Sequence, residues 1–184
     1  MKIGLDLDNC VFDAEPLYKQ AFTRTEYKYY PPKNYWVEEA YPKPVADNLS
    51  KIFRSEAVLW TKPFDFKLPG LINLISTNPQ HEVHVITARE LPNAKDGTIN
   101  QLRRNGIYIP NENIHITDFD KVQLAKFLKL DVIFDDSPIV IQNCLDNNIP
   151  CVMISTPVTP YNHHLRNKVE HYTSLYKALQ QKVK

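Results

Sequence analysis

The segment KIGLDLDNCV, residues 2–11, determines how the rest of the sequence is interpreted. It contains a short apolar run at residues 3–5, which Asp6 and Asp8 follow directly. A run this short, with little alternation between apolar and polar residues, is typical of a parallel strand covered on both faces. Because ligands of open parallel sheets bind beyond the carboxyl ends of the strands, we expect Asp6 and Asp8 to lie at a binding site.

Similar runs rich in Val and Ile recur along the chain and alternate with segments of helical periodicity. The predicted strands are residues 3–5, 83–86, 114–116, 132–134 and 151–154, and the predicted helices are 68–76, 98–105, 121–128, 138–147 and a closing helix at 171–183. This alternation predicts an α/β fold with a doubly wound parallel sheet and right-handed crossovers.

One segment interrupts the alternation and shows no convincing strand. Residues 14–23 and 45–53 have helical periodicity, and the stretch at 27–44 is rich in aromatic residues and proline. Proline keeps that stretch out of helix interiors and central strands. We therefore predict a small helical cap, residues 14–64, inserted into a core of residues 1–13 and 65–184.

Composition excludes several classes of function. The 184 residues include 22 Lys+Arg and 21 Asp+Glu, and a net charge of +1 gives no basic field for non-specific nucleic-acid binding. No apolar run approaches the roughly 20 residues of a membrane helix, and an acid at position 6 argues against a secretory leader. The 3 cysteines lack CxxC spacing, and the 4 glycines form no nucleotide-binding loop. We expect a cytoplasmic protein.

Polar residues follow several of the predicted strands. The set comprises Asp6, Asp8, Thr87, Lys121, Asp135 and Asp136. A single Asp at a strand end is most often a helix N-cap, but this whole ordered set is not explained by capping. Carboxylates gathered at one edge repel one another, and a divalent cation would compensate this repulsion. Because all the candidate ligand atoms are oxygens, we expect a hard metal ion, Mg²⁺. A hydroxyl and an amine that can meet phosphate oxygens complete a predicted site for a phosphoryl group.

These residues resemble the ordered motifs of the haloacid dehalogenase (HAD) superfamily of phosphotransferases. The resemblance implies a HAD-like Rossmannoid core. Within the superfamily the chain looks like the 5'(3')-deoxyribonucleotidase branch, because a helical insert directly follows the first motif. The other shared segments are FDFKLPG at 64–70, DDSP at 135–138 and PYN at 160–162.

The resemblance implies a role for each matching residue. Asp6 would attack phosphorus and become an aspartyl phosphate, and Asp8 would act as general acid and then general base. Thr87 would bind phosphoryl oxygens, and Lys121 would offset charge in the transition state. The implied Mg²⁺ ligands are Asp6, the backbone carbonyl of Asp8, and Asp135, with Asp136 close by or acting through water.

The sequence departs from the family at some positions. Asn9 and Cys10 replace the usual Gly and the Thr or Val after it, and Asn tolerates the turn geometry that Gly supplies. Ala14 occupies the place of an aromatic residue that helps stack the base in the deoxyribonucleotidases. Lys126 and Lys129 compete with Lys121 for the lysine role, and we prefer Lys121 because it begins its helix.

Substrate contacts are predicted from residues around the cap. Trp60 and Phe64 lie where the cap rejoins the core, so we expect them to contact substrate. Arg89 either meets phosphate or pairs with an acid such as Glu90. The other cap aromatics form either a base-stacking wall or the cap's own core.

The leading hypothesis is a Mg²⁺-dependent phosphomonoesterase acting on a nucleoside monophosphate. One alternative is a HAD phosphatase for another small phosphate ester or for a nucleic-acid 3'-phosphate end. Another is a phospho-acceptor signalling domain in which a phosphoaspartate acts as a switch. A HAD-fold binding module is a third, which the complete set of acids and Lys disfavours.

Overall fold

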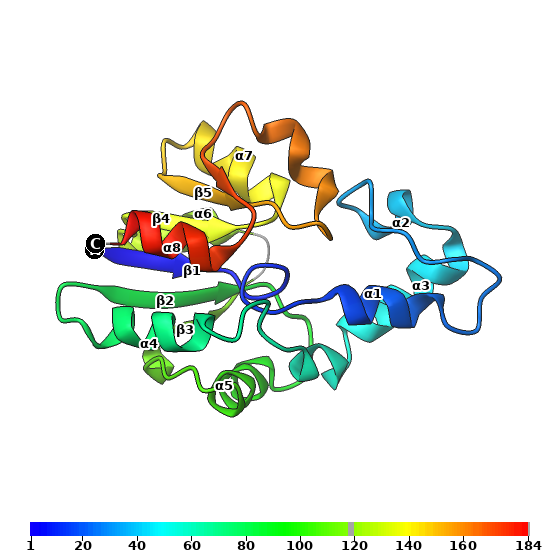
Figure 1. Cartoon of the computed structure of the whole chain (residues 1–184), viewed down its shortest axis with the longest axis horizontal. Helices are drawn as coiled ribbons and strands as arrows, with labels where there is room; N and C mark the ends of the chain where they lie inside the picture. Colours follow the sequence, from blue (N-terminus) through cyan, green and yellow to red (C-terminus); the bar gives the residue numbers. More distant parts are fainter. Residues whose placement is uncertain (118–119, 184) are drawn as a thin grey trace.

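The computed structural model describes residues 1–117 and 120–183, with a parallel sheet at its centre (Figure 1). The strand order is β3-β2-β1-β4-β5-β6, and every neighbouring pair is parallel. The strands are β1 (Lys2–Leu5), β2 (Glu82–Thr87), β3 (Ile114–Ile116), β4 (Val132–Asp135), β5 (Cys151–Ile154) and β6 (His171–Tyr172). The predicted doubly wound α/β fold is confirmed, and every predicted strand is present.

Helices follow the strands of the core. They are α4 (Leu68–Thr77), α5 (Ala94–Arg104), α6 (Lys121–Leu128), α7 (Pro138–Asp146) and α8 (Leu175–Lys182), with short 3₁₀ turns η2 (Asn111–Asn113) and η3 (Pro160–Leu165). Among the described residues, no helix has the length and apolar character needed to cross a bilayer.

Two predicted helix boundaries are wrong. Helix α5 begins at Ala94 rather than near Thr98. The predicted closing helix at 171–183 begins as the two-residue strand β6, and α8 starts only at Leu175, where the Ser174 hydroxyl accepts a hydrogen bond from the Lys177 amide. A strand of two residues is too short to leave a period-2 pattern, so the sequence does not distinguish β6 from the helix that follows it.

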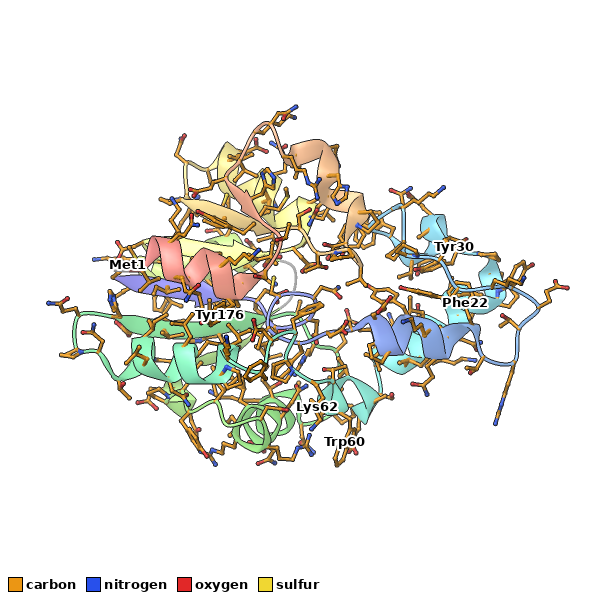
Figure 2. The ribbon with its side chains drawn as sticks, in the orientation of Figure 1. Met1, Phe22, Tyr30, Trp60, Lys62 and Tyr176 are labelled. Carbon is orange, nitrogen blue, oxygen red and sulfur yellow. The ribbon has the colours of Figure 1, made fainter. Side chains whose placement is uncertain are left out.

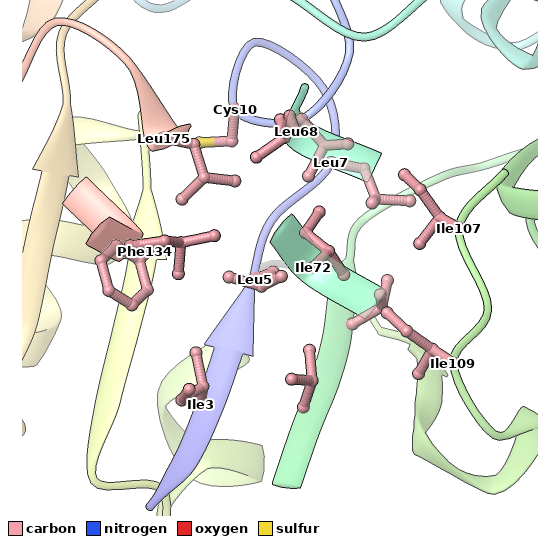
Figure 3. Packing of buried hydrophobic residues seen from close by; sticks show 14 of the residues in the cluster. Ile3, Leu5, Leu7, Cys10, Leu68, Ile72, Ile107, Ile109, Phe134 and Leu175 are labelled. Carbon is pink, nitrogen blue, oxygen red and sulfur yellow. The ribbon is translucent and has the colours of Figure 1, made fainter. Parts of the chain in front are cut away.

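The strands of the sheet are buried on both faces. Ile3, Leu5 and Phe134 point to the face covered by α4, α5 and α8 (Figure 3). Ile86 and Ile133 point to the opposite face, where α6 and α7 pack. This two-sided burial explains why the strands read as continuous apolar runs.

The segment between β1 and α4 forms a helical lobe beside the sheet (Figure 1). It contains α1 (Glu15–Phe22), α2 (Val37–Ala40), α3 (Lys43–Phe53) and the 3₁₀ helix η1 (Glu56–Trp60). Two details differ from the prediction: α2 lies inside the expected loop, and α3 begins before Val45 because proline fits the first turn of a helix.

The lobe has a hydrophobic core of its own. The ring of Phe22 packs against Tyr29, Tyr30 and Tyr41 with centroids 5.6, 5.7 and 5.3 Å apart. Figure 2 shows Phe22 and Tyr30 inside the lobe and Trp60 away from them. Tyr29 and Tyr30 therefore belong to the core of the lobe, the less specific of the two interpretations that the sequence allowed.

Candidate active site

The loop after β1 presents the first two acids. A tight turn follows strand β1. In this turn the amides of Val11 and Phe12 both donate to the carbonyl of Leu7, at 2.8 Å each. Asn9 has a φ of 63°, in the left-handed region that Asn tolerates and most other side chains avoid. This turn directs Asp6 and Asp8 beyond the end of the sheet. Cys10 is buried in the hydrophobic core beside Leu175 (Figure 3).

Lys121 lies between two of the predicted carboxylates. It is the first residue of α6, and its Nζ is 2.6 Å from Oδ1 of Asp6 and 2.8 Å from Oδ2 of Asp135. The two competing lysines lie elsewhere: the Nζ of Lys126 donates to Oδ1 of Asn147, and Lys129 caps the end of the helix. Of these three lysines, the structure places Lys121 against the acids.

Burial and charge repulsion dominate the electrostatics of this cluster. The pKa of Asp6 is raised to about 7, because burial and, to a smaller extent, repulsion from Asp135 and Asp8 outweigh the lowering effect of Lys121. Burial, followed by repulsion from Asp6 and Asp135, raises the pKa of Asp136 well above its usual range. Burial lowers the pKa of Lys121, but attraction to Asp135 and Asp6 outweighs it and raises that pKa overall. The buried carboxylates of Asp6, Asp135 and Asp136 outnumber Lys121, which amounts to an excess of negative charge whenever all of them are ionised.

A divalent cation fits this excess. Ligand atoms of Asp6, Asp136 and Cys10 all lie within 4.8 Å of one another. Asp135 is already engaged, because Oδ2 accepts from Lys121 and Oδ1 accepts from the Ser137 amide at 2.8 Å. The geometry thus favours Asp6 and Asp136 as direct carboxylate ligands, with Asp135 orienting Lys121. Two carboxylates with space for water are typical of Mg²⁺ sites.

Asp136 is held by residues that follow β5. The hydroxyl of Tyr161 donates to Oδ2 of Asp136, and the side-chain amide of Asn162 donates to the Asp136 carbonyl at 2.8 Å. Asn162 also donates to the carbonyl of Ile154 at 2.9 Å, which ties η3 to the end of β5. The sequence motif PYN at 160–162 therefore supports the acidic cluster, a role that its position in the chain did not reveal.

Asp8 and Arg89 form a bidentate ion pair. Nε of Arg89 donates to Oδ2 of Asp8 at 2.9 Å, and Nη2 donates to Oδ1 at 2.7 Å. Glu90, the acid named for this arginine in the sequence analysis, instead accepts from Arg54 at 3.2 Å. Thr87, at the end of β2, is also buried.

A cavity of about 280 Å³ lies above these groups, between the core and the lobe, and is open to solvent. Its polar floor includes Asp6, Asp8, Thr87, Arg89, Lys121 and Asp136. Its other wall comes from the lobe and includes Tyr18, Tyr35, Trp36, Phe53 and Arg54. The ring of Tyr35 contacts Tyr161 of the core at 5.6 Å between centroids, so the lobe meets the core next to Asp136.

Two predicted substrate contacts do not line this cavity. Trp60 is 64% exposed, and its ring stacks on the guanidinium of Arg104 at 4.0 Å. The backbone amide of Phe64 donates to the Val11 carbonyl at 3.1 Å, and its side chain is not part of the cavity wall. Tyr35 and Trp36 occupy the wall instead; the sequence signalled them only as members of the aromatic stretch.

This chain resembles known proteins in its structure and not detectably in its sequence. No protein-family model matches this sequence, and no curated protein matches it significantly. A haloacid dehalogenase-like hydrolase from Streptococcus pneumoniae superposes with a TM-score of 0.67 at 12% identity, covering 98% of this chain and 97% of that one. The chain has the fold of the haloacid dehalogenase-like hydrolases.

Two further solved structures share this HAD-like fold. A protein described as a phosphoglycolate phosphatase, from Lactobacillus delbrueckii, has a TM-score of 0.61 at 10% identity, covering 98% of this chain and 97% of that one. A protein named CbbY from Rhodobacter sphaeroides, solved with xylulose-(1,5)bisphosphate, has a TM-score of 0.56 at 16% identity, covering 95% and 94%. The matches span the lobe as well as the core.

Proposed function

We propose that this chain is a Mg²⁺-dependent phosphomonoesterase that acts through an aspartyl-phosphate intermediate on a nucleoside monophosphate. The observation that carries the proposal is the placement of Asp6 on the floor of the cavity with Lys121 2.6 Å away. The HAD-like fold of the neighbours supports the reaction class. In this proposal, residues 14–64 form the cap over a core of residues 1–13 and 65–184.

The reaction would proceed in two displacements. A carboxylate oxygen of Asp6 attacks phosphorus, the ester P–O bond breaks, and Asp8 gives a proton to the departing oxygen. Asp8 then accepts a proton from the water that attacks the aspartyl phosphate, which releases inorganic phosphate and regenerates Asp6. Lys121 and Thr87 would bind phosphoryl oxygens as negative charge develops on them.

The metal proposal rests on the acidic cluster. Asp6 and Asp136 would hold Mg²⁺ with the backbone carbonyl of Asp8, while Asp135 keeps Lys121 in position. The ion, when bound, would offset the negative charge of the carboxylates and the incoming phosphate. The orientation of Asp136 by Tyr161 is typical of the hydrogen bonds that support metal ligands.

The lobe wall supports the choice of a nucleoside monophosphate. Tyr35, Trp36 and Phe53 place aromatic surface opposite the acids, where a planar base can stack. Arg54 and Glu38 add polar groups to the same wall. The near-neutral charge of the chain gives no support for a polynucleotide substrate.

A second candidate is a phosphatase for another small phosphate ester, such as a sugar phosphate. The neighbour solved with xylulose-(1,5)bisphosphate favours it, because that protein has the same fold over nearly its whole length.

All three cysteines are free thiols, which is consistent with either enzyme working in the reducing cytoplasm.

A substrate panel tests the proposal. We expect kcat/KM for phosphate release to be highest for 5'- or 3'-nucleoside monophosphates, lower for sugar phosphates, and lowest for phosphorylated oligonucleotides. Asp6→Asn should abolish phosphate release with every substrate. When the reaction of the wild-type chain is quenched rapidly, the mass of the chain should increase by one phosphoryl group. A preference for sugar phosphates would replace the substrate class, and full activity of Asp6→Asn would overturn the mechanism. A phosphorylated chain that persists for minutes would instead indicate a signalling switch.

A further inference from the structure

The guanidinium of Arg89 has little capacity left for a phosphate. Its five N–H groups include the two donors to Asp8 described above. Nη1 donates to Oε1 of Gln101 at 2.7 Å and to Oγ1 of Thr98 at 3.2 Å. Four of the five N–H groups are therefore directed at protein atoms.

The residues that hold Arg89 are themselves fixed. Thr98 and Gln101 lie on α5 and are fully buried. Nε2 of Gln101 donates to Oγ1 of Thr61 at 3.0 Å and to the carbonyl of Val58 at 3.2 Å. The arginine is thus anchored between α5 and the segment by which the lobe returns to the core.

The geometry of the pair matters for Asp8. Both carboxylate oxygens of Asp8 face Arg89, whose planar guanidinium fixes a carboxylate in position and in orientation. The Asp8 side chain is 19% exposed and Arg89 only 2%, so the arginine lies behind the acid as seen from the solvent. Small misplacements of a proton-transfer group cost large factors in rate.

We propose that Arg89 is a positioning residue that aims Asp8 at the leaving-group oxygen, and that Gln101 and Thr98 in turn fix Arg89. Arg89 acts through Asp8 and is not a ligand of the substrate phosphate. This inference rests on the proposed function. It concerns the step in which the Asp6 oxygen–phosphorus bond forms, the ester P–O bond breaks, and the proton of Asp8 passes to the departing oxygen.

The test uses a series of ring-substituted phenyl phosphates that differ in the basicity of the leaving group. Esters with poor leaving groups need a general acid, whereas p-nitrophenyl phosphate needs little help. In Arg89→Met we expect kcat/KM for phenyl phosphate to fall by roughly 100-fold or more. The fall in kcat/KM for p-nitrophenyl phosphate should be smaller than this by a factor of about ten or more. The inhibition constant of inorganic phosphate should stay unchanged. A merely structural role would not steepen the dependence on the leaving group.

Three further variants make the test specific. Arg89→Lys keeps the charge without the bidentate geometry and should show the same steepening to a smaller degree, which provides a readout if Arg89→Met does not fold. Gln101→Met should behave similarly. Arg103→Gln is the matched control, because this arginine also lies on α5 but donates to Oδ1 of Asn111 at the surface, and we expect no change.

The outcomes distinguish a failure of the proposed function from a failure of the role proposed for Arg89. If the wild-type chain hydrolyses neither these esters nor any nucleoside monophosphate, the proposed function fails and this inference fails with it. If the wild-type chain is active but Arg89→Met slows all esters equally and weakens phosphate inhibition, Arg89 is a phosphate ligand and this inference alone is overturned.

Discussion

The Nζ atom of Lys121 lies 2.6 Å from Oδ1 of Asp6, although 115 positions separate the two residues. Both side chains are nearly inaccessible to solvent, at 6% and 9% exposure. A buried charge is tolerated only when it is paired, so each of these residues depends on the other. This pair joins the end of β1 to the beginning of α6, and it links the stability of the fold to the chemistry of the site.

Replacing Lys121 should therefore affect both properties. In Lys121→Met the carboxylates of Asp6 and Asp135 lose their buried cation, and we expect the free energy of unfolding to fall by about 3–5 kcal/mol in metal-free buffer. Phosphate release should fall at least ~100-fold. Urea denaturation and steady-state kinetics measure the two effects. Lys126→Met, on the same helix but outside the cluster, is the control and should change neither quantity.

The raised pKa of Asp6 predicts an unusual pH dependence of stability in metal-free protein. Burial, with repulsion from Asp135 and Asp8, gives this carboxyl a pKa of about 7, against an ordinary value of 3.8 for an aspartate. The folded state therefore binds the proton more tightly than the unfolded state. The resulting stabilisation is fully present below about pH 4 and is lost as the pH rises through 7.

A comparison with Asp6→Asn isolates this contribution from those of other groups. Between pH 5 and pH 8, with EDTA present, the wild-type chain should lose more unfolding free energy than Asp6→Asn. Addition of Mg²⁺ should reduce the difference, because a bound cation favours the ionised carboxylate. Parallel stability curves for the two proteins in EDTA would show that the carboxyl of Asp6 is not perturbed in this way.

Tyr161 should control the affinity for the metal. Tyr161→Phe removes the hydroxyl that donates to Oδ2 of Asp136 and leaves the ring in place. Loss of such a supporting hydrogen bond typically weakens metal binding about 10- to 100-fold, and we expect the Mg²⁺ concentration for half-maximal activity to rise accordingly. Tyr172→Phe is a suitable control, since that hydroxyl bonds with Glu170 and Gln181 at the surface. Unchanged Mg²⁺ dependence of Tyr161→Phe would remove Asp136 from the metal site.

The two tryptophans should differ in their effect on substrate binding. Trp36 lines the cavity, whereas Trp60 stacks on Arg104 outside it. If the substrate is a nucleotide, Trp36→Ala should raise KM by roughly 5- to 150-fold, corresponding to about 1–3 kcal/mol of stacking. Trp60→Ala should leave KM unchanged. The opposite result would restore Trp60 as the substrate contact and would assign the cavity wall to the packing of the lobe.

Short-range patterns predicted the sheet well because its strands are buried on both faces. Residues 132–134 read as a strand from three apolar letters, and the acids after them marked the edge where the site lies. Lys121 could be preferred because a lysine at the first position of a helix points to the same edge. These predictions need only local periodicity and the rule that parallel strands end together.

The contacts that were missed depend on tertiary structure. Nothing in the helical pattern of residues 98–105 shows that Thr98 and Gln101 turn inward to hold Arg89. Both Trp36 and Trp60 are cap aromatics, and the sequence gives no local signal that only Trp36 faces the cavity. The path of the irregular stretch at 27–44 brings Trp36 there. For the same reason the sequence does not indicate Asp8 as the partner of Arg89, because only the pairing of β1 with β2 brings the two residues together.

The central position of β1 has a consequence for biosynthesis. Its neighbours in the sheet are β2 and β4, so Ile3 pairs with Val83 on one side and with Val132 on the other. One edge of β1 therefore stays unpaired during synthesis until β4 has been translated, well after β2 has become available to the other edge. Premature termination before β4 would release a fragment in which β1, the strand that leads to Asp6, forms an unprotected edge that is prone to aggregate.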